Sequence, residues 1–231
     1  MSDISRIQKQ IIDAFNFRHA CKVFDPERKI SDDQFNTILE AARLSPSSLG
    51  FEPWQILMVQ SPEKRELLRD FTWGANGATN GTAGQLGTAS HFMIMLAHTD
   101  ATMRHHSEYL QQHMRDVKQL PEEVIDFINQ AYEKFQKVDF GLESRRQITD
   151  WCARQAYIAL GNMMTAAALM GIDSCPIEGF DMARTSAALQ EHFGIDPERY
   201  QPAVMLAFGY RAGEPHHAKT RREMDQIVTW Y

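Results

Sequence analysis

The sequence has few cysteines, and none of them stand at a metal-binding spacing. Its 231 residues include three, Cys21, Cys152 and Cys175, and no Cys-x-x-Cys occurs. This pattern argues against both a disulfide framework and a cysteine zinc site. The first ten residues also lack the apolar core of a signal peptide. We therefore expect a cytoplasmic chain whose thiols stay reduced.

The chain also lacks a run of residues apolar enough to cross a membrane. Residues 155–172 carry no charge, and eighteen residues could nominally span a bilayer. However, alanine and glycine dominate this stretch, and Asn162 and Thr165 interrupt it. We expect a helix that is buried on nearly all sides, and no membrane partner.

An excess of positive charge is missing as well. The formal net charge is -6, from 24 basic and 30 acidic residues. A general nucleic-acid binder needs a basic face to neutralise phosphates, so we expect no nucleic-acid partner. The composition, 43% apolar and 23% charged, is that of a folded protein. The length favours one domain, residues 1–231, with some additional segments around its core.

Common catalytic and nucleotide-binding motifs are absent. The sequence contains no G-x-G-x-x-G after a strand, no G-x-x-x-x-G-K-[ST] and no G-x-S-x-G. The motif S-x-x-K occurs at Ser61–Lys64, where it begins an amphipathic surface helix. We therefore interpret this match as a chance occurrence. His105, His106 and His113 lie in a charged segment. His106 and His113 share a helix face, but no carboxylate or third ligand has the usual close spacing, so we expect no metal site.

What the sequence does contain is a mixture of helices and short strands. Apolar periodicity, caps and breakers predict both kinds of element. We expect helices near 4–16, 31–44, 62–71, 149–170 and 181–194. We expect strands near 55–59, 91–97, 203–208 and around Cys175, with a strand-like end at 226–231. Residues 74–87 hold five glycines and form a loop, and a helical excursion broken at Pro121 covers 100–140. The fold class is α+β, with helices packed around a small mixed sheet.

Three short segments could carry chemistry. In an extended Arg18–Lys22 segment, alternation puts Arg18 and Lys22 on one face, where they suit a phosphate or form a solvated basic edge. Residues 45–54 bring adjacent hydroxyls and a glycine together, either as a polar pocket or as an ordinary turn. Residues 176–180 contain Gly179, which lets a flat ligand approach the backbone closely or serves a plain strand-to-helix loop.

Taken in order, these segments resemble a known family. The matching pieces are Arg18-His-x-x-Lys22-x-Phe24, Ser45-Pro-Ser-Ser48 with Pro53-Trp54, Ala89-Ser-His91, Pro176-Ile-Glu-Gly-Phe180 and Lys219-Thr-Arg221-Arg222. The chain is similar to the nitroreductase family of flavin-dependent NAD(P)H oxidoreductases, most strongly to its oxygen-insensitive bacterial type.

The resemblance implies an interlocked homodimer with FMN in two interface sites. Arg18, Lys22, Lys219 and Arg221 would hold the FMN phosphate and nearby polar groups, and His19 and Ala20 would line the same wall. Glu178 and Gly179 would lie at the reactive edge, with a backbone N–H near flavin N5. The remaining cofactor contacts that it implies are Pro46, Ser47, Ser48, Gly50, Gln85, Pro176 and Ile177, the three at 46–48 coming from the partner subunit.

The resemblance also implies the reaction. NADH or NADPH would deliver a hydride to flavin N5, and a nitroaromatic or quinone-type acceptor would follow in ping-pong order, with no catalytic side chain. The excursion at 100–140 would cover the active site, with Phe135 or Phe140 contacting substrate, and the tail at 210–231 would reach the partner. Three alternatives stay open: a quinone, enone or pterin reductase of this fold, a flavin-binding protein without nicotinamide turnover, or an interaction protein without flavin.

Overall fold

A central antiparallel sheet organises the chain. The computed structural model describes residues 3–231, so the first two residues of the predicted domain lie outside the described residues. Four strands pair in the order β1-β2-β4-β3, namely β1 (Trp54–Met58), β2 (His91–His98), β3 (Asp173–Ile177) and β4 (Tyr200–Gly209). All three strand pairs are antiparallel. The parallel contribution to the sheet, which was predicted as mixed, is a single bridge between Ala20 and Ser174.

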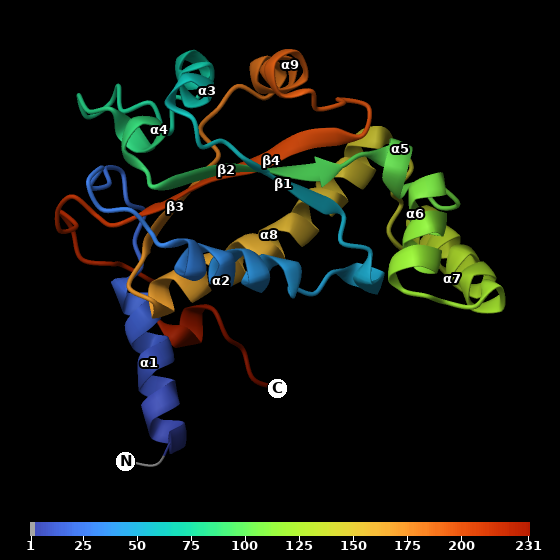
Figure 1. The fold of residues 1–231 in the computed structure, drawn as a ribbon. Coiled ribbons are helices and arrows are strands. Elements are labelled where there is room, and N and C mark those ends of the chain that lie inside the picture. Colours follow the sequence, from blue (N-terminus) through green and yellow to red (C-terminus); the bar gives the residue numbers. More distant parts are fainter. Residues whose placement is uncertain (1–2) are drawn as a thin grey trace.

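Helices cover both faces of this sheet (Figure 1). One face carries α3 (Pro62–Glu66), α4 (Gly84–Thr88) and α9 (Met182–Phe193), and the other carries α2 (Asp32–Arg43) and α8 (Arg145–Leu169). Because both faces are covered, residues 92–97 of β2 are all buried instead of alternating with polar positions. Successive side chains of β2 enter opposite cores: Ile94 packs towards α9, and Met95 packs towards α8.

The predicted helical excursion forms a third packed unit at one end of the molecule (Figure 1). It comprises α5 (Asp100–Met103), α6 (Glu108–Gln112) and α7 (Glu122–Lys134), with π-helical turns at His113–Val117 and Phe135–Asp139. Pro121 breaks the chain as expected and becomes the N-cap of α7. Leu110, Ile125 and Tyr132 pack with Trp151, so the excursion rests on the first half of α8.

Two expectations about the apolar helices and the tail are wrong. The helix α8 begins at Arg145, where Ser144 and Gln147 form a capping box, and it exposes Tyr157, Ile158 and Leu169 by 37–52%. It is therefore buried on one flank only. Residues 227–231 form no strand, because the tail lies along no sheet edge of this chain, and a 3-10 turn at Met224–Gln226 precedes them. Within residues 3–231, no helix is long and apolar enough to span a membrane.

The first helix, α1 (Asp3–Phe17), contacts α8 but leaves an apolar stripe exposed. It projects from the body of the molecule, beside the C-terminal tail (Figure 1). The stripe consists of Ile4, Ile7, Ile11, Ile12 and Phe15, each at least 42% exposed. A stripe of this length facing water marks an interaction surface.

Buried His98 makes stability depend on pH. Burial, followed by the charges of Arg199 and His113, lowers the pKa of His98 to about 4 from 6.5, and the side chain is 2% exposed. Because the pKa of His98 is lower in the folded chain, the unfolded chain binds the proton at a higher pH as the pH falls. Stability is therefore full above pH 6.5 and is lost as the pH falls towards 4. We expect the titration of His98 to lower the free energy of unfolding by about 2 kcal/mol between pH 7.5 and pH 4.5.

Urea unfolding of wild type and His98→Gln at pH 7.5 and 4.5 measures this contribution. The substitution should reduce the loss of unfolding free energy between the two pH values, whatever it costs at pH 7.5. Equal losses in the two proteins would contradict the assignment.

Candidate functional site

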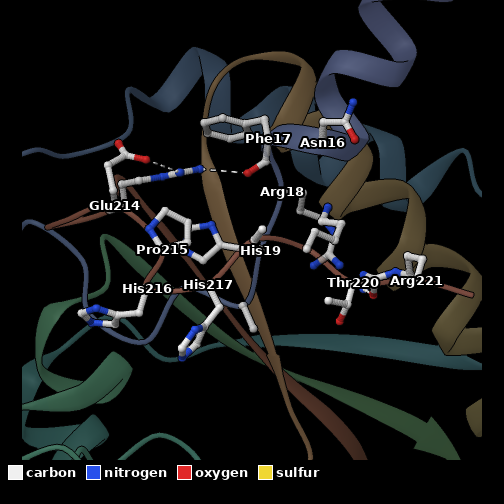
Figure 2. Close-up of a pocket in the computed structure, with 14 residues that line it drawn as sticks. Asn16, Phe17, Arg18, His19, Glu214, Pro215, His216, His217, Thr220 and Arg221 are labelled. Carbon is white, nitrogen blue, oxygen red and sulfur yellow. Dashed lines mark hydrogen bonds and ion pairs between the residues drawn. The ribbon is translucent and has the colours of Figure 1, made fainter.

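Two adjoining hollows lie where the two ends of the chain meet. One has a volume of about 640 Å³ and the other about 710 Å³. They share His19, Ala20 and residues 214–217, so they form one continuous trough. Figure 2 shows the first hollow, with Arg18, Thr220 and Arg221 at one side and Glu214 at the other. One wall comes from residues 16–22 and the facing wall from residues 211–221.

Three cations line the first hollow without a carboxylate partner. Arg18, Lys219 and Arg221 all face it. Among the described residues, no Asp or Glu forms an ion pair with any of the three. Burial, and then the charges of Arg18 and Arg221, lower the pKa of Lys219. Like charges gathered this way repel one another, and an anion between them would relieve that repulsion. The family resemblance implied that these three cations meet Lys22 as well. The structure brings the three together, whereas Lys22 lines the second hollow and is thereby separated from Arg18, which lines the first.

A buried ion pair holds the trough's two walls in place. Arg211 Nη2 lies 2.7 Å from Asp173 Oδ1 at the start of β3, and the Asp173 side chain is only 3% exposed. Arg211 Nη2 also donates to the Phe17 carbonyl at 3.0 Å, and Figure 2 shows this link. Sequence reasoning missed this pair, because Arg211 and Asp173 stand far apart in the chain and neither belongs to a recognisable motif.

His19 presents an unsatisfied polar atom near the trough. Its Nδ1 is buried and has no hydrogen-bond partner within residues 3–231, although Asp173 Oδ1 lies 3.7 Å away. Burial, followed by the charge of Arg211, lowers the pKa of His19, which keeps the imidazole neutral near pH 7. A buried nitrogen without a partner is uncommon in folded proteins.

The second hollow gathers polar groups around β3. Lys22 Nζ lies 3.6 Å from Cys175 Sγ, and the buried Gln85 Nε2 donates to the same sulfur at 3.3 Å. Lys22 and Gln85, both predicted site residues, therefore meet at Cys175, which the sequence left without a role. Trp73 and Asn80 complete the rim. Pro176 and Ile177 continue β3, and Ile177 is buried in the core.

The Glu178–Gly179 segment follows β3 and is fixed on both sides. Tyr157 of α8 donates a hydrogen bond to Glu178 Oε1. The N–H of Gly74 donates to the Gly179 carbonyl at 2.7 Å, and a Cβ on Gly179 would lie 2.6 Å from Gly74 Cα. The close approach of the Gly74 backbone thus requires the glycine, whereas the sequence offered either a flat ligand or a plain strand-to-helix loop as the reason.

Other predicted residues lie outside the two hollows of this chain. The hydroxyl segment is held against α8 and the excursion: Ser48 N–H donates to Gln155 Oε1 at 2.9 Å, and the Gly50 carbonyl accepts from His113. The predicted residues of this segment, none of which lines either hollow, are Pro46, Ser47, Ser48 and Gly50. Phe135 packs against Trp151 at 5.8 Å between ring centroids, and Phe140 is 55% exposed. Neither phenylalanine lines the trough.

A family model identifies the class of protein to which this chain belongs, a family of oxidoreductases. The nitroreductase family model matches residues 16–210, and the chain belongs to the nitroreductase family, as its sequence motifs predicted.

Three similar proteins illustrate the relationship. YfkO of Bacillus subtilis, named as an NAD(P)H nitroreductase, is 48% identical over 97% of this chain and 98% of its own. A crystal structure from Exiguobacterium sibiricum, described as a nitroreductase in complex with FMN, has a TM-score of 0.72 at 22% identity and covers 96% of this chain and 97% of its own. CLA-ER, described as an enone reductase of gut-bacterial fatty acid metabolism, also has a TM-score of 0.72 at 22% identity, with the same coverage.

The contact between Gly74 and Gly179 yields a stability prediction. Gly179→Ala forces a methyl group against the Gly74 backbone, and we expect a loss of about 1–3 kcal/mol of unfolding free energy. The matched control is Gly213→Ala, since a Cβ there meets nothing within 4 Å. Chemical denaturation measures both. A Gly179→Ala protein as stable as the control would show that the two backbones do not approach so closely.

Proposed function

We propose that this protein is an FMN-dependent NAD(P)H oxidoreductase that reduces nitroaromatic or quinone-type acceptors. The observation that carries the proposal is the group of three unpaired cations, Arg18, Lys219 and Arg221, in one pocket. The name of the B. subtilis relative and the FMN in the E. sibiricum structure agree with it. The continuous trough is compatible with a bound anionic cofactor.

The residues present suit FMN. Arg18 and Arg221 would bind the phosphate through their planar guanidinium groups, and Lys219 would add a point charge. His19 and Ala20, which belong to both hollows, would line the passage from the phosphate to the ring system. Lys22 and Gln85 would face the ring in the second hollow, with Lys22 as the cation and Gln85 as a neutral donor.

When bound, FMN would supply the redox chemistry, which is hydride transfer between NADH or NADPH and the acceptor. The protein's side chains would bind and orient. Tyr157 holds the Glu178 carboxylate, and the pairing with Gly74 fixes the Gly179 backbone beside Trp73, at the rim of the second hollow. Burial raises the pKa of Tyr157, as does its bond to Glu178, so the hydroxyl keeps its proton and remains the donor.

A homodimer would explain the residues that the single chain leaves apart. The α1 stripe is exposed, as are Ile227 and Trp230 in the tail. The excursion packs at the far end of α8 from α1 (Figure 1), so it would cover the partner's site and not its own. Pro46, Ser47 and Ser48 would reach the partner's cofactor in the same way. The domain would then be residues 1–231, and the tail at 210–231 would reach the second subunit.

Cofactor binding tests the basic pocket. We expect the purified protein to show flavin absorption that is bleached by NADH or NADPH without oxygen. Arg221→Ala should weaken FMN binding about tenfold or more, because one charge-assisted hydrogen bond is worth about 1.5–3 kcal/mol. Quenching of FMN fluorescence on titration of the apoprotein gives the dissociation constant.

The neighbouring Arg222→Ala is the matched control, since Arg222 lines neither hollow. Equal affinity in the two variants would remove Arg221 from the site. A colourless protein that takes up no FMN would overturn the proposed function. Bound FMN that neither nicotinamide bleaches would favour a flavin-binding protein without turnover. An acceptor panel of a nitroaromatic, a quinone, an enone and a pterin would rank the remaining alternatives.

The α1 stripe predicts the oligomeric state. Light scattering should give twice the chain mass of 26.5 kDa for the wild type. A charge buried at an apolar interface is costly, so Ile11→Asp should shift the protein towards monomer at micromolar concentration. Leu67→Asp changes an exposed leucine that lies outside α1 and the tail, and it should stay dimeric. A monomeric wild type, or a dimeric Ile11→Asp protein, would contradict this assignment of α1.

A further inference from the structure

A second cluster of polar side chains lies in the excursion and belongs to neither hollow. His105 and His106 follow α5, and Glu133 stands near the end of α7. One ligand atom from each of the three lies within 4.8 Å of the other two. His106 Nε2 is 3.4 Å from Glu133 Oε2, and His105 Nδ1 is 4.0 Å from the same oxygen. Two imidazoles and a carboxylate therefore converge on one point.

The spacing fits a small divalent cation. Zn²⁺ binds histidine nitrogen at about 2.0–2.1 Å and carboxylate oxygen at about 2.0–2.2 Å in a tetrahedral arrangement. Ligand atoms on such an ion lie roughly 3.3 Å apart, by the geometry of those bonds. The 3.4 Å pair already has this separation, and the 4.0 Å pair needs a small side-chain adjustment. The imidazole rings are 5.3 Å apart at 80°, so they approach the shared point from different directions.

A second observation at this cluster is the state of the His105 imidazole. Its Nδ1 is buried and has no hydrogen-bond partner among the described residues. The backbone around it is fixed: the His105 N–H donates to Gln136 Oε1 at 2.9 Å, and Gln136 Nε2 donates to the Met103 carbonyl at 2.8 Å. Gln136 lies in the π-helical turn directly after α7, so this turn fixes the His105 backbone beside the end of α7, where Glu133 lies.

We propose that His105, His106 and Glu133 form a binding site for a divalent transition-metal ion of the zinc class, with water in the fourth position. Imidazole nitrogen with one carboxylate oxygen suits zinc and its neighbours among the first-row metals. The ion fastens the segment after α5 to the end of α7, and so stiffens the excursion. The site stands apart from the FMN trough and does not depend on the proposed function.

Lys137 opposes this binding and offers a sharp test. Its Nζ holds the other Glu133 oxygen, Oε1, at 2.6 Å and adds a positive charge beside the site. Removing that charge while keeping the stem length, as in Lys137→Met, strengthens the attraction between Glu133 and a cation. Random binding to exposed histidines elsewhere would not respond to this change.

The experiment is equilibrium dialysis of the full-length protein against Zn²⁺ in a non-chelating buffer, with metal analysis. The wild type should retain one zinc per chain above any background. His106→Ala and the shape-conserving Glu133→Gln should each weaken binding at least tenfold, and Lys137→Met should tighten it. Zinc should also raise the melting temperature of the wild type more than that of Glu133→Gln, which reports binding without reference to turnover.

His192→Ala is the matched control, because His192 and Glu191 form a His–Glu pair at 3.9 Å without a third ligand. It should bind zinc like the wild type. The proposal is overturned if the wild type retains no zinc. It is equally overturned if Glu133→Gln, which folds without a change of shape, binds as tightly as the His192→Ala control.

Discussion

The ion pair between Arg211 and Asp173 is the constraint on which the candidate site depends. Asp173 begins β3 and Arg211 follows β4, so the pair ties two neighbouring strands at the edge of the sheet. The same guanidinium reaches the Phe17 carbonyl at the end of α1. Arg18 and His19 come directly after Phe17, and residues 214–221 come shortly after Arg211. Breaking a buried pair of this kind leaves an uncompensated charge, and both walls of the trough would lose their anchor.

Much of the architecture follows from local signals that a sequence displays. The capping serine at Ser31, the break at Pro121 and the apolar run of β2 each act within a few residues, and the structure contains all three elements where expected. The motifs of the candidate site are equally local, so their residues could be named in advance. Their gathering in one trough could be anticipated for Arg18, Lys219 and Arg221 only through the resemblance to a family.

What the sequence could not predict depends on contacts between distant segments. Gly179 meets Gly74, and Cys175 lies between Lys22 and Gln85, through packing that no periodicity reveals. Glu133 stands 27 residues beyond His106, so its approach to the two histidines could not be predicted from their spacing. An apolar pattern indicates that a segment is buried but does not identify the surface that buries it. For this reason the burial expected on nearly all sides of α8 and the strand expected at the end of the tail were wrong.

The separation of the two walls has a kinetic consequence. The bond from Arg211 to the Phe17 carbonyl joins residues 194 positions apart, and the bond from Lys219 to the Phe15 carbonyl joins residues 204 positions apart. Contacts of such range close large loops and form late, once the intervening chain has found its place. The trough is therefore complete only when the whole chain is folded. Any ligand that it holds secures both ends of the polypeptide at once, so occupancy and global stability rise and fall together.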